Sequence, residues 1–159
     1  MKPFIILLTL PFLVTLQLSA NTDAVSDTPA FSFPVVQEAV VISEFGPRTH
    51  PVLKTEHPHS GVDFQVAIGD FVVASAAGVV HAVDGRGTYG KRIDIEHPGG
   101  YITRYAHLSE FYGDIKAGDV VEAGQLIAFA GNTGMVAEPV LHFELLKEGA
   151  ALDPLRYLQ

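Results

Sequence analysis

The sequence of 159 residues contains no cysteine. This absence excludes disulfide bonds, thiolate nucleophiles and every zinc site built on cysteine ligands. It also leaves a lipid anchor without an attachment site before the polar stretch that follows residue 20. A zinc site in this chain would have to use histidine and carboxylate ligands.

Basic residues are also scarce. The chain has 10 lysines and arginines against 18 aspartates and glutamates, which gives a formal net charge of −8. No run of lysine or arginine could form the basic groove that neutralises nucleic-acid phosphates. We therefore expect no nucleic-acid partner, and the dispersed acidic residues are typical of a solvated surface.

The long apolar run of the sequence lies within the first 20 residues. It follows the basic start Met1-Lys2, is interrupted by Pro11 and Gln17, and ends at Ala20 before the polar "NTDAVSDTPA". This layout predicts a secretory signal peptide over residues 1–20, and therefore an exported, periplasmic or secreted protein. A membrane anchor is the alternative, but the run is short of the roughly 20 apolar residues that a span needs.

Helical periodicity is missing too, because no segment of ten or more residues shows a clean apolar stripe. Residues 21–35 carry Ser, Thr, Asp, Asn and Pro without periodicity, which predicts a disordered linker. From about Val41 onward, short runs such as "GVVHAV", "RIDIEH" and "QLIAFAG" are separated by glycine-containing turns. The pattern predicts one all-β, mostly antiparallel domain over residues 36–159.

One motif, "GRGTYG" at residues 85–90, matches the dinucleotide fingerprint G-x-G-x-x-G. That fingerprint binds pyrophosphate only where a strand passes into a helix. The residues that follow, "KRIDIEH", alternate as a strand does. We interpret the motif as a glycine-rich hairpin loop.

Three stretches bring histidine together with other polar groups. In "HPHSGVDF", an extended chain points His59 and Asp63 to one side. In "YITRYAH", alternation groups Tyr105 with His107, and in "VLHFEL" His142 shares a face with Val140 and Glu144. Two histidines and a carboxylate form a ligand set that catalytic zinc accepts, yet each histidine taken alone is more often a packed, structural residue. The zinc-protease motif His-Glu-x-x-His and the hydrolase motif Gly-x-Ser-x-Gly are both absent from the sequence.

Taken in order, several blocks resemble the lysostaphin/LytM-type zinc metalloendopeptidases. These blocks are "EFGPRTHP", "HSGVDF", "YITRYAHLSEFY", "KAGDVVEAGQLIAFAGNTG" and "PVLHFELLKEGAALDPLRYL". The resemblance covers roughly residues 43–158. It implies a compact β-domain whose antiparallel sheet floors a narrow groove, and an exported enzyme that cuts peptide cross-links of bacterial peptidoglycan.

The resemblance also assigns roles to individual residues. His59, Asp63 and His142 fall on the three zinc-ligand positions, and His107 falls on one of two catalytic-histidine positions. The other catalytic position, the first His of a His-Leu-His-Phe-Glu block, is occupied by Val140.

Two residues are weaker candidates for contacts with substrate. Arg48 is expected to orient substrate or to brace the groove, with a surface salt bridge as the alternative. Tyr105 is a candidate because it shares a face with His107. For both Tyr105 and Glu144, however, packing or support of the ligands from behind is the default expectation.

Val140 leaves two functions open. The first is zinc-dependent peptidoglycan hydrolysis with His107 as the remaining proton carrier. The second is a catalytically degenerate domain that binds and activates a separate cell-wall amidase, although such regulators commonly lose zinc ligands as well. A biotinyl- or lipoyl-carrier domain is disfavoured, because "EAGQ" offers no lysine on the expected turn.

Overall fold

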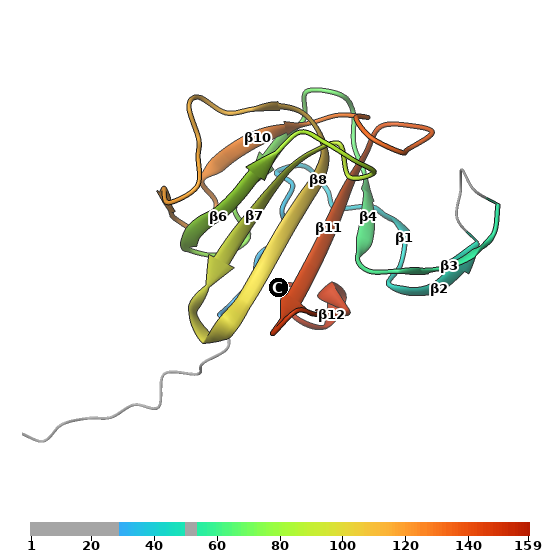
Figure 1. Cartoon of the computed structure of the whole chain (residues 1–159), viewed down its shortest axis with the longest axis horizontal. Coiled ribbons are helices and arrows are strands. Elements are labelled where there is room, and N and C mark those ends of the chain that lie inside the picture. Colours follow the sequence, from blue (N-terminus) through green and yellow to red (C-terminus); the bar gives the residue numbers. More distant parts are fainter. Residues whose placement is uncertain (1–28, 50–53) are drawn as a thin grey trace, which may run out of the picture.

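The computed structural model describes residues 29–49 and 54–159, and their regular structure is nearly all strand (Figure 1). The strands are β1 (Val41–Ser43), β2 (Gly46–Thr49), β3 (Glu56–His59), β4 (Val62–Gln65), β5 (Phe71–Val73), β6 (Gly78–Asp84), β7 (Lys91–His97), β8 (Tyr101–Phe111), β9 (Val120–Val121), β10 (Leu126–Ala130), β11 (Val140–Lys147) and β12 (Ala150–Leu152). Two short 3₁₀ turns, η1 (Pro98–Gly100) and η2 (Pro154–Arg156), complete the set. The expected all-β class is confirmed.

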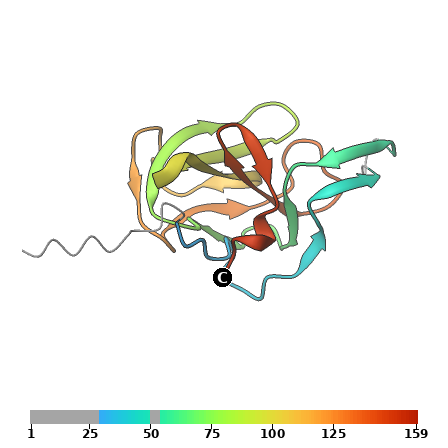
Figure 2. The same ribbon diagram turned by 90° about the horizontal axis from the view of Figure 1, so that it is seen from below.

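The main sheet has the strand order β1-β4-β11-β8-β7-β6-β9, and every neighbouring pair in it is antiparallel. The long strand β8 serves two parts of this sheet. Its first half lies between β7 and β11, whereas its second half pairs with β10, which in turn pairs with β5. Figure 2 shows β10 (orange) passing beneath the main strands, so that the sheet curls over its own apolar face.

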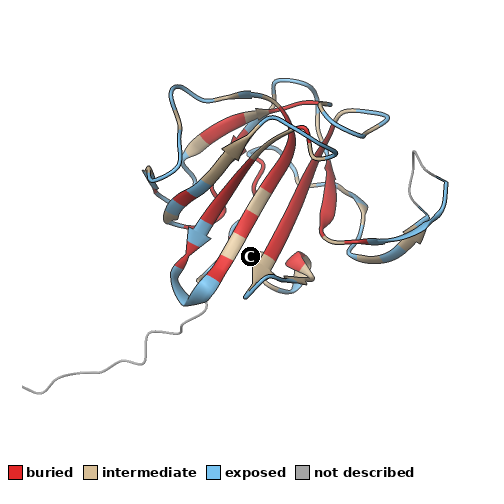
Figure 3. Cartoon of the chain, in the orientation of Figure 1, coloured by how far each residue is buried: buried red, intermediate tan, exposed pale blue. Residues whose placement is uncertain are grey.

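The hydrophobic core fills the space inside this curl. Along β11, Leu141, Phe143 and Leu145 are at most 1% exposed and belong to the core, while His142 and Glu144 take the opposite face. The alternation expected from "VLHFEL" is therefore confirmed. Figure 3 shows β11 and the central part of the sheet as the most continuously buried region.

The segment before β1 packs against the domain, which corrects the predicted linker at residues 29–35. Phe31 is 1% exposed, forms a bridge with Leu158, and places its ring edge-on to His97 and Tyr101 at centroid distances of 5.3 and 5.7 Å. Val35 forms a second bridge, with Val72 of β5. The composition of this stretch is that of a linker, but Phe31 and Val35 pack at the edge of the core and hold the stretch against the domain.

The predicted signal peptide and residues 21–28 lie outside the described residues. Within residues 29–49 and 54–159, no helix is long and apolar enough to cross a membrane.

A separate two-stranded sheet, β2–β3, projects beside the main sheet (Figure 1). The chain leaves it at His59, makes a tight connection through Gly61 and enters β4. A side chain at Gly61 would place its Cβ 2.3 Å from the carbonyl oxygen of Phe143, so only glycine allows β4 to approach β11 this closely. The tight connection places His59 over the open face of β4 and β11.

Candidate metal centre

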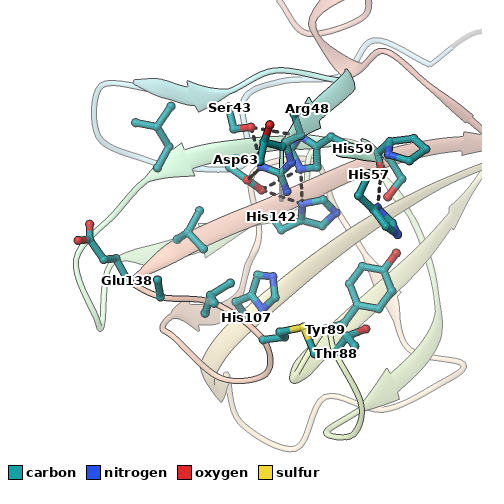
Figure 4. A pocket seen from close by; sticks show the side chains of 18 of the residues that line it. Ser43, Arg48, His57, His59, Asp63, Thr88, Tyr89, His107, Glu138 and His142 are labelled. Atoms are coloured by element: carbon teal, nitrogen blue, oxygen red, sulfur yellow. Dashed lines mark hydrogen bonds and ion pairs between the residues drawn. The ribbon is translucent and has the colours of Figure 1, made fainter. Parts of the chain in front are cut away.

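Three predicted ligands from separate strands meet at one point. His59 ends β3, Asp63 lies on β4, and His142 on β11 is the direct cross-strand partner of Asp63. The His59 Nε2 atom lies 3.1 Å from Asp63 Oδ1 and 3.0 Å from His142 Nδ1, and the latter two atoms are 2.8 Å apart. All three residues are buried. The structure thus brings together residues that stand up to 83 positions apart in the sequence (Figure 4).

The protonation of both imidazoles is fixed by acceptors on their far sides. His59 Nδ1 lies 2.7 Å from the carbonyl oxygen of Glu44, which can only accept, so Nδ1 carries the proton. His142 Nε2 lies 3.0 Å from the carboxylate of Glu144, so this nitrogen is also the protonated one. In the neutral rings, the nitrogens that face each other then both present lone pairs to a cation, beside a carboxylate oxygen.

Three lone-pair donors at about 3 Å from one another repel unless a cation lies between them. Two neutral imidazole nitrogens and one carboxylate oxygen are the ligand set of many catalytic zinc sites, which leave a fourth position open. The outward N–H groups bound to a carbonyl and a carboxylate are the usual second contacts of zinc-ligating histidines. His59, Asp63 and His142 therefore fit Zn²⁺ both in donor chemistry and in orientation.

Arg48 of β2 contacts the other oxygen of the Asp63 carboxylate. Its Nη1 lies 2.6 Å from Asp63 Oδ2 and 2.6 Å from the hydroxyl oxygen of Ser43. Burial raises the pKa of Asp63, but its contacts with the His142 and His59 imidazoles outweigh this effect and lower the pKa well below its usual range. Arg48 thus forms an ion pair with a candidate metal ligand on the groove wall.

His107 lies in the same groove because β8 contains a β-bulge. A step of two residues along β7, from Lys91 to Ile93, is matched by a step of three along β8, from Leu108 to Tyr105, so β8 carries one extra residue here. His107 has a φ of 62°, a backbone conformation that few residues other than glycine adopt without strain. The bulge turns His107 to the open face, where its ring lies edge-on to His142 at a centroid distance of 5.9 Å.

The His107 imidazole is oriented by the backbone. Its Nδ1 lies 2.8 Å from the carbonyl oxygen of Thr133 and therefore donates, which leaves Nε2 as an acceptor on a side chain that lines the groove. Burial lowers the pKa of His107 below its usual value of 6.5, and the hydrogen bond to Thr133 offsets this only in part. The ring is therefore neutral at pH 7 and can accept a proton.

The bulge also explains why the candidate role of Tyr105 as a substrate contact is wrong, whereas its default role in packing is observed. Tyr105 is fully buried in the core, with its ring against Phe143 at 5.3 Å and its hydroxyl accepting from the backbone N–H of Ser75 at 2.7 Å. Regular alternation would place Tyr105 and His107 on one face, but the extra residue in β8 separates them. Tyr105 is a core residue and does not contact the groove.

The groove above the trio of candidate ligands, His59, Asp63 and His142, has a volume of about 690 Å³. In Figure 4, Glu138 and His57 lie on opposite sides of the trio. One part of the lining is apolar and comes mainly from the segment before β11, comprising Met135, Val136, Ala137, Pro139 and Val140. Val140 itself is 7% exposed and shares the face of His142, so it brings a hydrocarbon surface close to the metal-binding atoms.

Sequence reasoning missed Tyr89, which lies in the loop carrying "GRGTYG". Its hydroxyl donates to Glu144 Oε1 at 2.7 Å, and its ring lies 5.7 Å from that of His142. The motif was correctly assigned to a loop, but nothing in its spacing indicates that it folds over β11. The contact between Glu144 and His142 is consistent with the supporting role expected for Glu144. Burial raises the pKa of Glu144, but hydrogen bonds from His142 and Ser60 outweigh this effect and lower the pKa to about 2.

Comparison with known proteins agrees with this geometry. The family model described as "Peptidase family M23" matches residues 57–154, a range that includes all three candidate ligands and His107. The chain belongs to peptidase family M23. The resemblance to zinc metalloendopeptidases inferred from the sequence blocks is thereby confirmed.

Individual members of family M23 resemble the chain over most of its length. It is 39% identical over 125 residues to the peptidoglycan DD-endopeptidase ShyA of Vibrio cholerae, covering 78% of this chain and 29% of ShyA. A crystal structure of a zinc-containing peptidase from Vibrio cholerae superimposes with a TM-score of 0.72 at 39% identity, covering 79% of this chain and 39% of that one. The catalytic domain of lysostaphin from Staphylococcus simulans gives a TM-score of 0.66 at 30% identity, covering 75% and 91% of the two chains. The chain thus spans about a third or less of the ShyA sequence.

Proposed function

We propose that this protein is an exported, zinc-dependent endopeptidase that hydrolyses peptide bonds in bacterial peptidoglycan. The observation that carries the proposal is the convergence of His59 Nε2, Asp63 Oδ1 and His142 Nδ1, three lone-pair donors within about 3 Å of one another. Family membership supports the reaction class, and the name of ShyA supports the substrate. The predicted signal peptide supports the location, since peptidoglycan lies outside the cytoplasmic membrane.

The residues of the groove have two tasks in this reaction, which are to hold the metal and to transfer a proton. Zinc, when bound, polarises a carbonyl group and lowers the pKa of a coordinated water toward about 7. Asp63, fixed by Arg48, and the two histidines hold the metal on the sheet. His107 Nε2 accepts the proton released as water attacks the peptide carbonyl carbon, and returns it to the amine nitrogen as the C–N bond breaks.

Val140 shifts this chemistry onto His107. The family pattern has a second histidine at this position, and a valine can neither carry a proton nor donate a hydrogen bond to a developing oxyanion. Loss of one such group typically lowers the rate by about 10²–10⁴. We therefore propose a slow endopeptidase in which His107 serves both proton-transfer steps.

Val140 also favours a second candidate function, in which the groove binds and activates a cell-wall amidase without hydrolysing peptides. Against it stands the complete set of candidate metal ligands, together with the outward hydrogen bonds of both histidines and the Arg48–Asp63 pair. A domain that only binds a partner has no need to maintain these contacts.

Digestion of purified, cross-linked peptidoglycan by the zinc-loaded protein separates the two candidates. New peptide termini found by mass spectrometry, and missing with the His142→Ala protein, are expected for an endopeptidase. If a folded, zinc-bound protein releases no products but stimulates an amidase on the same substrate, the second function replaces the first.

A further inference from the structure

The carboxylate behind His142 is unusually well held. Glu144 is 1% exposed and accepts hydrogen bonds from four side chains. His142 Nε2 and the Tyr89 hydroxyl reach its Oε1 at 3.0 and 2.7 Å, and Ser60 donates to the same oxygen. Arg104 Nη1 reaches Oε2 at 3.0 Å. Both oxygens are therefore engaged, and the carboxylate has no freedom to rotate.

The register of the sheet extends this contact across three strands. Glu144 of β11 lies directly opposite Arg104 of β8, which lies directly opposite Asp94 of β7. Arg104 binds Asp94 through two parallel hydrogen bonds of 2.8 and 2.9 Å. This two-point contact fixes the plane of the guanidinium group, which a single hydrogen bond cannot do.

Tyr89 covers this row of charges from the groove side. Its ring lies over the guanidinium carbon of Arg104 at 5.0 Å, a cation–π contact, while its hydroxyl holds Glu144. Tyr89 also lines the groove, so it contacts both Glu144 and Arg104 from the groove side without being a core residue.

The burial of these charges is informative. The side chains of Asp94, Arg104 and Glu144 are 5%, 19% and 1% exposed, respectively. Buried ion pairs are a poor source of stability, because desolvation offsets the attraction and apolar residues of similar size do as well or better. A row of buried charges that ends on a metal ligand is better explained by the orientation it imposes on that ligand.

We propose that Arg104, Asp94 and Tyr89 are positioning residues that act through Glu144 to hold His142 with Nδ1 toward the metal. With Glu144 locked, the His142 ring cannot flip, and its proton stays on Nε2. The inference rests on the proposed zinc site, and it adds residues on β7, on β8 and in the loop before β7 as determinants of zinc affinity.

The test measures metal binding, not hydrolysis. Zinc dissociation constants would be determined by chelator competition for the wild type and for Glu144→Gln, Arg104→Lys and Tyr89→Phe. We expect Glu144→Gln to weaken binding about 10- to 100-fold, and Arg104→Lys and Tyr89→Phe about 3- to 10-fold each, as for loss of one hydrogen bond. The visible spectrum of the cobalt-substituted protein should also change in each variant, because the geometry at His142 changes.

Matched controls are available elsewhere in the chain. Tyr112→Phe and Arg156→Lys make the same chemical changes at exposed sites, where the Arg156 side chain is 81% exposed. Both controls should bind zinc as the wild type does. Thermal midpoints of the metal-free proteins separate positioning from folding, and Tyr89→Phe, which loses only a hydroxyl, should retain its midpoint.

Two outcomes would overturn different claims. If the variants keep wild-type zinc affinity and cobalt spectra, whatever their thermal midpoints, the row of charges does not position His142 and contributes only to the fold. A wild-type protein that binds no zinc would instead overturn the proposed function.

Discussion

His142 and Asp63 face each other directly across the β4–β11 pair, with Nδ1 and Oδ1 2.8 Å apart. Two neighbouring strands thus supply two of the three candidate ligands through register alone, and their relative position is as rigid as the sheet. The third ligand, His59, depends on the tight connection through Gly61. The candidate metal centre is therefore built into the central sheet and does not depend on long loops.

Removal of any one ligand should abolish stoichiometric zinc binding. We expect His59→Ala, Asp63→Ala and His142→Ala to retain little zinc after dialysis, because two remaining ligands hold zinc poorly. Metal content per folded protein, determined by elemental analysis, provides the measurement. His81→Ala is the control, since the His81 side chain is 56% exposed and lies outside the groove. Stoichiometric zinc in the His142→Ala protein would remove His142 from the ligand set.

His107→Gln should separate metal binding from catalysis. The variant keeps a side chain able to donate to the Thr133 carbonyl but has no group that titrates. We expect zinc content to stay the same and peptidoglycan hydrolysis to fall by about 10²–10⁴. Rates of peptide release at equal zinc occupancy provide the measurement. An undiminished rate would mean that another group in the groove transfers the proton.

Val140→His should raise the rate of hydrolysis if Val140 is what limits the enzyme. Val140 shares the face of His142 and lines the groove, so an imidazole at this position would enter the groove. A gain of about tenfold or more is expected. Val140→Thr serves as the control, because it keeps the shape of valine without supplying an imidazole. Equal rates in the two variants would show that the groove has diverged at other positions too.

Acid should destabilise the fold through His97, far from the metal site. His97 is 3% exposed, and its Nδ1 donates to the Ala77 carbonyl at 2.8 Å. Burial lowers its pKa in the folded protein below the usual 6.5, and this hydrogen bond offsets the shift only in part. The unfolded chain therefore binds the proton first as the pH falls. The contribution of neutral His97 is complete above about pH 6.5 and declines from there toward the lowered pKa, by about 1.4 kcal/mol per pH unit.

The free energy of unfolding between pH 5 and 8 measures this effect. Within the window, the wild type should show a steeper loss of stability than His97→Gln, which cannot titrate. Identical slopes for the two proteins would mean that His97 is not the group responsible.

Phe31→Ala tests whether the segment before β1 is part of the folded domain. Phe31 is 1% exposed between His97 and Tyr101, so its removal should cost about 3 kcal/mol in the free energy of unfolding. Phe33→Ala is the matched control. Because Phe33 is 36% exposed, its removal should lower the free energy of unfolding less than removal of Phe31 does. Chemical denaturation of both variants gives the comparison. If both substitutions change the free energy of unfolding equally and only slightly, residues 29–35 are a linker and not part of the folded domain.

Much of the site followed from the sequence by itself. The alternation in "VLHFEL" determined that Leu141 and Phe143 point into the core while His142 and Glu144 point away, because a strand repeats every two residues. The order of the sequence blocks carried the resemblance to the family, and that resemblance supplied the candidate ligands. These features are local or ordered along the chain, so no tertiary contact was needed to see them.

Tertiary structure decided what depends on contacts between distant strands. The bulge in β8 placed Tyr105 and His107 on opposite faces of the sheet, because β8 carries one extra residue there relative to β7. Packing placed Phe31 in the core despite the composition around it. Folding of the "GRGTYG" loop set Tyr89 on Glu144, and register aligned Glu144, Arg104 and Asp94 into one row. The sequence determined which residues could bind a metal, and the pairing of strands decided which others hold them in place.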